Sequence, residues 1–188
     1  AVLKWLPTTR ISVDSNFVAA IPRRLRESLR QMDIKGAVGV LGWSQVGPIT
    51  DSNAADDVMA VWDLELDLED AKLKDGSWVQ GIRGTIRTAG HSTPNGPMAD
   101  GFLLIDSMAL RGVPLANVQG PFALRESKIY FGQKVADVKS LNTSASVAPN
   151  PIQVDLFSGK GVVSGTGDFE PLRFSMQTNL YGGQLQDV

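Results

Sequence analysis

Residues 61–70, VWDLELDLED, decide the fold class, because apolar and acidic side chains alternate along them. Trp62, Leu64, Leu66 and Leu68 are separated by the acidic residues at 63, 65, 67 and 69. Successive side chains of a β-strand point to opposite faces of its sheet, so this segment has one apolar and one acidic face. We therefore predict a strand with its leucines inside and its carboxylates outside.

Short runs of the same kind recur along the chain, and glycine, proline, asparagine and aspartate separate them as turn residues would. We predict about ten strands. They should form a mainly β fold, an elongated, curved antiparallel sheet built from repeated hairpins, because short glycine turns favour sequential pairing over crossovers. The runs contain Ile11 and Val13; Val79, Ile82 and Ile86; Phe102 to Met108; Val118, Phe122 and Leu124; Ile129 and Phe131; Val135 and Val138; and Ile152, Val154 and Leu156.

Residues 21–32, IPRRLRESLRQM, depart from this pattern and predict one short helix. Leu25, Leu29 and Met32 fall on one stripe, and Pro22 suits a first helical turn. Two interpretations of the polar surface stay open. The helix packs on the sheet with its arginines in water, or it is a basic helix that contacts anionic lipid head groups. The arginines are Arg23, Arg24, Arg26 and Arg30.

We expect a single domain, residues 1–188, with two regions. Residues 1–58 form a helix-containing leading region, and residues 59–188 form the region of repeated hairpins. A weak repeat supports the second region, because DGSWVQGIRGTI (75–86) and RGVPLANVQGPF (111–122) carry glycines at the same spacing. A glycine inside a strand often marks a bulge or bend, which makes Gly84 and Gly120 candidate bend positions.

Composition narrows the function classes. The chain of 188 residues has a formal net charge of −2 and no cysteine. This charge gives no general reason to expect nucleic acid as a partner, and no disulfide or cysteine metal site can form. The sequence contains neither a signal-peptide pattern nor an apolar run of roughly 20 residues. We expect any export signal or membrane anchor to lie outside this chain.

No catalytic constellation stands out, so we expect no enzymatic activity, no cofactor and no metal. His91 is the only histidine and falls in GHSTPNGP, which predicts a turn-rich surface loop. DSNAADD (51–57) departs from a calcium loop at Ala55, and SGKGVVSG (158–165) lacks the order of a phosphate-binding loop. The acidic row at 63–69 fits a solvated sheet face better than paired acid–base chemistry.

Glycine motifs near the end of the chain suggest a family. LYGGQL (180–185) and LFSGK (156–160) resemble a recurring step of leucine, aromatic residue and two glycines, and VQGPFALRESKIYFG (118–132) resembles a glycine-bearing strand that leads into a basic strand start. Such steps are typical of the AsmA-like superfamily of bacterial envelope proteins, which includes TamB-type proteins. The resemblance covers roughly residues 60–188. Ser158 and Asp187 stand where the family's step has glycine.

The resemblance implies a non-enzymatic, lipid-handling segment of a larger periplasmic or cell-envelope protein, anchored to the inner membrane by a segment outside this chain. An apolar concave sheet face would carry phospholipid acyl chains, and neighbouring repeats of the same chain would lengthen it, for phospholipid transfer or outer-membrane biogenesis. The arginines of residues 21–32 would contact lipid heads or a membrane surface. The predicted lining residues are Trp62, Leu64, Leu66, Leu68, Ile82, Ile86, Phe102, Leu104, Val118, Phe122 and Leu124.

The alternation is equally typical of a closed β-sandwich, which would be a carbohydrate-binding or structural interaction module. Trp5, Trp43, Trp62 and Trp78 could stack on sugars, although Trp62 lies in the apolar register of its strand. A sugar site needs exposed aromatic side chains beside polar groups. The last nine residues, LYGGQLQDV (180–188), predict an open strand edge with which a following repeat would pair.

Overall fold

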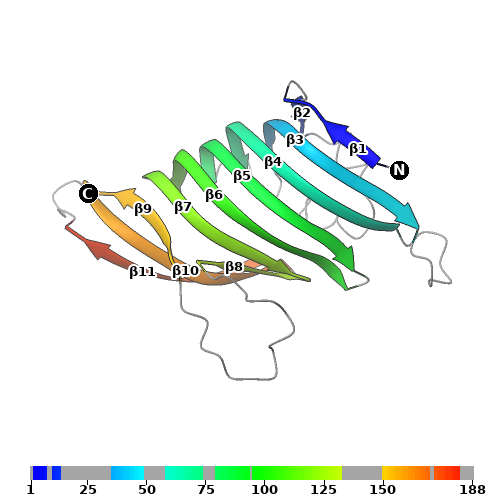
Figure 1. Cartoon of the computed structure of the whole chain (residues 1–188). Helices are drawn as coiled ribbons and strands as arrows, with labels where there is room; N and C mark the ends of the chain where they lie inside the picture. The colour runs from blue at the N-terminus through cyan, green and yellow to red at the C-terminus, as the bar shows by residue number, and fades with distance from the viewer. Residues whose placement is uncertain are drawn as a thin grey trace.

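The computed structural model describes residues 2–7, 10–13, 35–48, 58–73, 79–93, 95–132, 150–169 and 172–182. In these ranges the regular structure is one antiparallel sheet of 11 strands, and no helix is found among them. Figure 1 shows that the long strands curve along their length. The strands are β1 (Val2–Trp5), β2 (Arg10–Ser12), β3 (Lys35–Pro48), β4 (Val58–Leu73), β5 (Val79–Thr93), β6 (Gly96–Leu110), β7 (Val113–Arg125), β8 (Lys128–Phe131), β9 (Ile152–Leu156), β10 (Gly159–Phe169) and β11 (Leu172–Tyr181).

The strand order follows the chain from β3 to β8, and β10 and β11 complete the path. This confirms the predicted sequential antiparallel pairing for most of the sheet. The position between β7 and β10 departs from this sequential order, because two strands, β8 and β9, share it. β8 pairs with the end of β7 near Phe122, and β9 pairs nearer its start at Ala116. β10 then pairs with both.

Cross-strand partners lie on the same face of a sheet, so the register defines two faces. Leu66 pairs with Val40 on one side and Ile86 on the other, and this row forms the apolar face. Glu65 pairs with Leu41 and Arg87, and this row forms the polar face. The alternation predicted for residues 61–70 is therefore confirmed through Glu69.

The hydrophobic cluster of the sheet lies on the apolar face of β6, β7 and β9. Ile105, Val118, Ile152 and Val154 form a cluster whose members are 3–8% exposed. Leu64, Leu66 and Leu68 lie on the same face and are only half-buried. Among the described ranges there is one sheet and no second sheet that packs on it, which differs from a closed sandwich.

The curvature coincides with a line of irregular positions that crosses the strands. Bulges bend a strand and increase its local twist, so several side by side bend the whole sheet. Gly84 lies at such a register shift, as its position in the sequence predicted. Neighbouring strands have shifts too, among them those between Lys35 and Ala37, between Leu68 and Ala71, and between Ala116 and Gln119, with positive φ at Gly36, Asp70 and Asn117.

Gly120 serves a different purpose from the predicted bend. It pairs regularly with Leu103, and a Cβ there would lie 2.8 Å from the Cα of Ile152. Only a residue without a side chain lets β9 approach β7 so closely. The turn after β9 explains the LFSGK motif, because Phe157 and Ser158 both have positive φ, at 50° and 55°. That pair of angles is typical of a tight hairpin turn.

The helix predicted at residues 21–32 lies outside the described residues. The proposed boundary at residue 58 stays a prediction; β3, which precedes it, pairs with β4 from Lys35 to Pro48. His91 does not lie in a loop, because β5 continues through it to Thr93 and the turn begins only afterwards.

Candidate functional site

The apolar face is the candidate site, and most of the predicted lining residues meet on it. Its rows cross the sheet from strand to strand; one runs from Leu68 through Gly84 and Ile105 to Val118. The predicted residues that the register and the packing place on this face are Trp62, Leu64, Leu66, Leu68, Ile82, Ile86, Val118, Phe122 and Leu124.

Phe102 and Leu104 do not belong to this set. Phe102 pairs with Arg87, and Leu104 pairs with Thr85, so both lie on the polar face. The reason is that residues 102–105, FLLI, are apolar without interruption, so the sequence gives no period to show which residues turn inward. Leu103 and Ile105 occupy the apolar face instead.

Strands β10 and β11 add an apolar surface that the sequence prediction did not include. β10 presents a row of glycines to this face, and side chains of β11 lie over them. A Cβ at Gly167 would meet the ring of Phe174, and one at Gly165 would lie 3.0 Å from the side chain of Met176. The ring of Phe131, from β8, approaches Phe174 with centroids 6.3 Å apart. Cross-strand partners of this kind are invisible in the sequence until the register is known.

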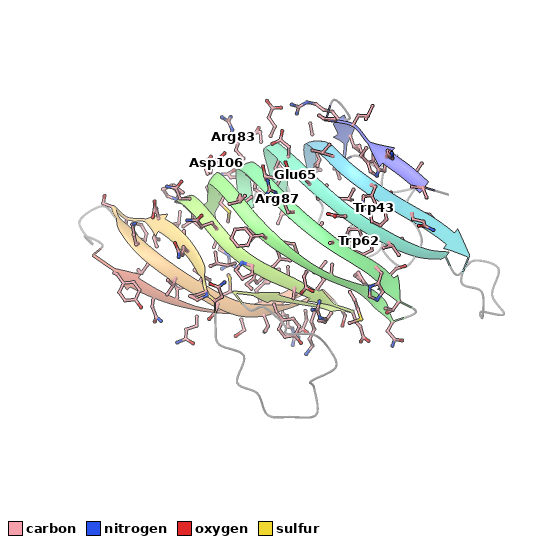
Figure 2. The ribbon with its side chains drawn as sticks, in the orientation of Figure 1. Trp43, Trp62, Glu65, Arg83, Arg87 and Asp106 are labelled. Carbon is pink, nitrogen blue, oxygen red and sulfur yellow. The ribbon has the colours of Figure 1, made fainter. Side chains whose placement is uncertain are left out.

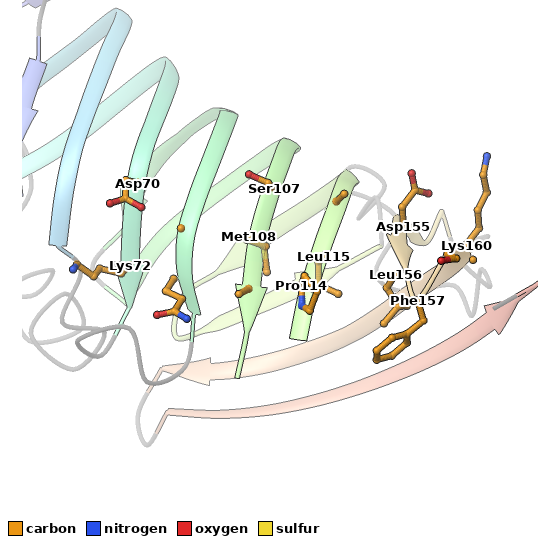
Figure 3. Close-up of a pocket in the computed structure, with 16 residues that line it drawn as sticks. Asp70, Lys72, Ser107, Met108, Pro114, Leu115, Asp155, Leu156, Phe157 and Lys160 are labelled. Carbon is orange, nitrogen blue, oxygen red and sulfur yellow. The ribbon is translucent and has the colours of Figure 1, made fainter. Parts of the chain in front are cut away.

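A cavity of about 950 Å³ opens near one end of the strands, beside the β9–β10 turn (Figure 3). Its lining is amphipathic. Met108, Leu115 and Leu156 belong to the apolar packing around the central cluster. Charged and polar groups line the same cavity and give it a polar rim: Asp70, Lys72, Ser107, Asp155 and Lys160.

The polar face carries a second, smaller feature around Trp43. Its indole is 38% exposed and lies opposite Asp63 in the register. The next row holds Glu65, whose Oε2 accepts a 2.8 Å hydrogen bond from Nε of Arg87. Figure 2 shows Trp43, Glu65 and Arg87 on neighbouring strands. Together with Leu41 they line a shallow depression of about 190 Å³.

The other tryptophans differ from Trp43. Trp5 and Trp62 lie on the apolar face, where their indole N–H groups donate to Ser44 and Thr88. Each therefore combines apolar contact with a satisfied donor, as half-buried indoles usually do. Trp78 lies outside the described residues. Only Trp43, among the tryptophans that the structure describes, meets the requirement for an exposed aromatic beside charged groups.

The remaining chemistry of the described ranges is sparse. They contain no group of three or more His, Cys, Asp or Glu side chains that could hold a metal ion. No helix within them is long and apolar enough to cross a membrane. Comparison with known proteins gives no match to a family model, to a curated protein or to a solved structure. The geometry and the short motifs therefore carry the functional argument.

Proposed function

We propose that the bent sheet is an open groove that binds the acyl chains of a lipid along its apolar face, without catalysing a reaction. One observation carries this proposal. The central leucines Leu64, Leu66 and Leu68 remain half-buried on a face over which the described residues place no second layer. A sheet with one apolar face stabilises itself by covering that face with another element or a ligand.

An acyl chain suits this face physically. Neighbouring strands lie about 4.8 Å apart, so a row of apolar residues across many strands forms a long continuous path. Each Å² of apolar surface removed from water contributes about 25 cal/mol. A flexible hydrocarbon follows a curved path without needing specific polar partners. The amphipathic cavity beside the β9–β10 turn offers the polar rim that a lipid head requires.

The biological setting rests on the resemblance to AsmA-like proteins. On that basis the chain is a segment of a cell-envelope or periplasmic protein that handles phospholipid, in lipid transfer or outer-membrane biogenesis. Neighbouring repeats would lengthen the groove, and an anchor outside this chain would hold it at the inner membrane. The lipid-head contact proposed for Arg23, Arg24, Arg26 and Arg30 falls outside the described residues and stays a prediction.

Gentle purification followed by native mass spectrometry and lipid extraction tests the proposal. The wild type should carry phospholipid. Leu66→Glu places a charge between Val40 and Ile86, where burial without a partner is costly, so retained lipid should fall several-fold. Asp67→Lys, one residue further and on the polar face, is the matched control and should retain lipid.

Circular dichroism separates loss of lipid from loss of fold. A folded Leu66→Glu protein that keeps as much lipid as the wild type contradicts the groove. Unfolding of Leu66→Glu, with no lipid on the wild type, instead indicates a covered core at this position.

A carbohydrate-binding function is the second candidate, and the exposure of Trp43 beside Asp63 and the Glu65–Arg87 pair favours it. Indole faces stack on sugar rings while carboxylates accept hydroxyl hydrogen bonds. A glycan array with the wild type and Trp43→Ala tests this candidate. Binding that disappears in Trp43→Ala and persists in Leu66→Glu would assign the polar face as the site.

A further inference from the structure

The two outer edges of the sheet are built differently. At one edge, β3 is covered by β1 and β2, which are only four and three residues long. At the other edge lies β11, an uninterrupted strand of ten residues that pairs, within the described ranges, only with β10. Short edge strands are a common protection against pairing with another chain, whereas a long regular one is a template for it.

Apart from Arg173 near its start, β11 lacks the other usual protections as well. Its sequence, LRFSMQTNLY, contains no lysine and no proline, and its pairing with β10 shows no register shift that would mark a bulge. Residues 173–181 are all exposed. Phe174, Met176 and Leu180 face the apolar side, and the last two are 49% and 51% exposed. Within the described ranges, the outer edge of β11 is therefore not paired with another strand, and it lies beside an apolar row.

We propose that β11 pairs with β11 of a second copy of this chain, antiparallel and about a two-fold axis at Gln177. Side chains of a strand alternate between faces, so a register centred on a residue keeps apolar opposite apolar. Phe174 then lies opposite Leu180, and Met176 opposite Thr178, on the apolar face. On the polar face, Arg173 lies opposite Tyr181, Ser175 opposite Asn179, and Gln177 opposite itself.

This register makes β11 complementary to itself. Glutamine and the serine–asparagine pair can hydrogen bond across the axis. A guanidinium beside a tyrosine ring gains a cation–π contact. Phenylalanine beside leucine is a favourable cross-strand pair, and no like charges meet. The apolar faces of both copies then become one continuous surface. The pairing itself does not depend on the proposed lipid binding, but a second copy and a following repeat would compete for this one edge of β11.

The interface is small. It consists of one strand from each copy with its adjacent side chains, whereas a standard stable interface buries about 1,600 Å² in total. Main-chain hydrogen bonds supply most of the affinity in such strand additions, and side chains set the register. We therefore expect a dimer that depends on concentration, and dissociates on dilution, rather than a permanent one.

Sedimentation velocity of the full chain over a hundredfold range of concentration tests the pairing. The wild type should shift from monomer to dimer. A variant with both Met176→Lys and Thr178→Lys puts two pairs of lysines directly opposite each other. Its dimer dissociation constant should rise at least about tenfold. A variant with Met176→Glu and Thr178→Glu should behave in the same way when it is alone.

Mixing these two variants gives the decisive measurement, because each lysine then faces a glutamate only in the proposed register. The mixture should form a one-to-one dimer that neither variant forms alone. Leu3→Lys, on β1 at the other edge, is the matched control for an added exposed lysine and should dimerise like the wild type. A wild type that stays monomeric throughout, or a mixture that stays monomeric, would overturn the proposal. So would a lysine variant that dimerises as the wild type does.

Discussion

The two phenylalanines Phe122 and Phe174 test whether the sheet has an enclosed centre and an open edge. Phe122 is 7% exposed, lies over Gly101 and pairs with Phe131, so its removal leaves a cavity. Phe122→Ala should therefore lower the free energy of unfolding by about 3–5 kcal/mol. Phe174 is 38% exposed on the edge strand, so water can enter the space it vacates. Phe174→Ala should cost only about 1–2 kcal/mol.

Urea unfolding followed by tryptophan fluorescence measures the difference. With a slope of about 1–3 kcal/mol per M, a difference of about 1–4 kcal/mol separates the two unfolding midpoints by roughly 0.3–4 M, and mid-range values give about 1 M. Protein concentration must stay low enough to exclude association through β11, since pairing would cover Phe174. Equal losses for the two substitutions, at unchanged slope, would show that Phe174 is as enclosed as Phe122. The reasoning from exposure would then be wrong, and the apolar face would be covered as far as β11.

Three further predictions use the same unfolding assay. Gly42→Ala should lower the free energy of unfolding by about 2–3 kcal/mol, because φ is +124° and a Cβ there would meet a backbone carbonyl oxygen of the paired strand. Gly47→Ala is the control and should be neutral or stabilising, because a Cβ there meets nothing within 4 Å. Equal effects of the two substitutions would contradict this account. Arg87→Ala should lower the free energy of unfolding by less than about 1 kcal/mol, because the ion pair of Arg87 with Glu65 is exposed. High salt should abolish this small difference from the wild type, and a loss that does not depend on salt would contradict the prediction. Arg125→Ala should lower the free energy of unfolding by about 2–3 kcal/mol, because this largely buried guanidinium donates hydrogen bonds to two backbone carbonyl groups and a carboxylate. A loss no larger than that of Arg87→Ala would refute this reasoning.

The sequence predicted the fold where one face is strictly polar. In β4 the carboxylates at 63, 65 and 67 leave no choice about which side chains share a face, and the register agrees. The prediction of an irregular strand position at Gly84 was also correct, because the register shifts there. These signals are local, because each depends on a residue's immediate neighbours in the chain.

The errors arise where the deciding interaction is not local. Leu103 and Ile105 could not be separated from Phe102 and Leu104, because a continuous apolar run carries no period. The close approach of Ile152 to Gly120 joins β9 to β7 across a long separation in sequence. The exposure of Trp43 depends on its pairing with Asp63, which the sequence of β3 does not reveal.

The glycines explain how the sheet can keep an apolar face over which the described residues place no second sheet. A ring that packs against a glycine on the adjacent strand loses part of its exposed surface, as Phe122 does at Gly101 and Phe174 does at Gly167. Rings from both sides of β10 also approach one another across its glycines, and the contact between Phe131 and Phe174 is an example. This packing lowers the exposed apolar area but cannot remove it, because each residue still has one side toward the open face. The exposure that remains on Leu64, Leu66 and Leu68 is the surface on which a hydrocarbon chain would gain the most.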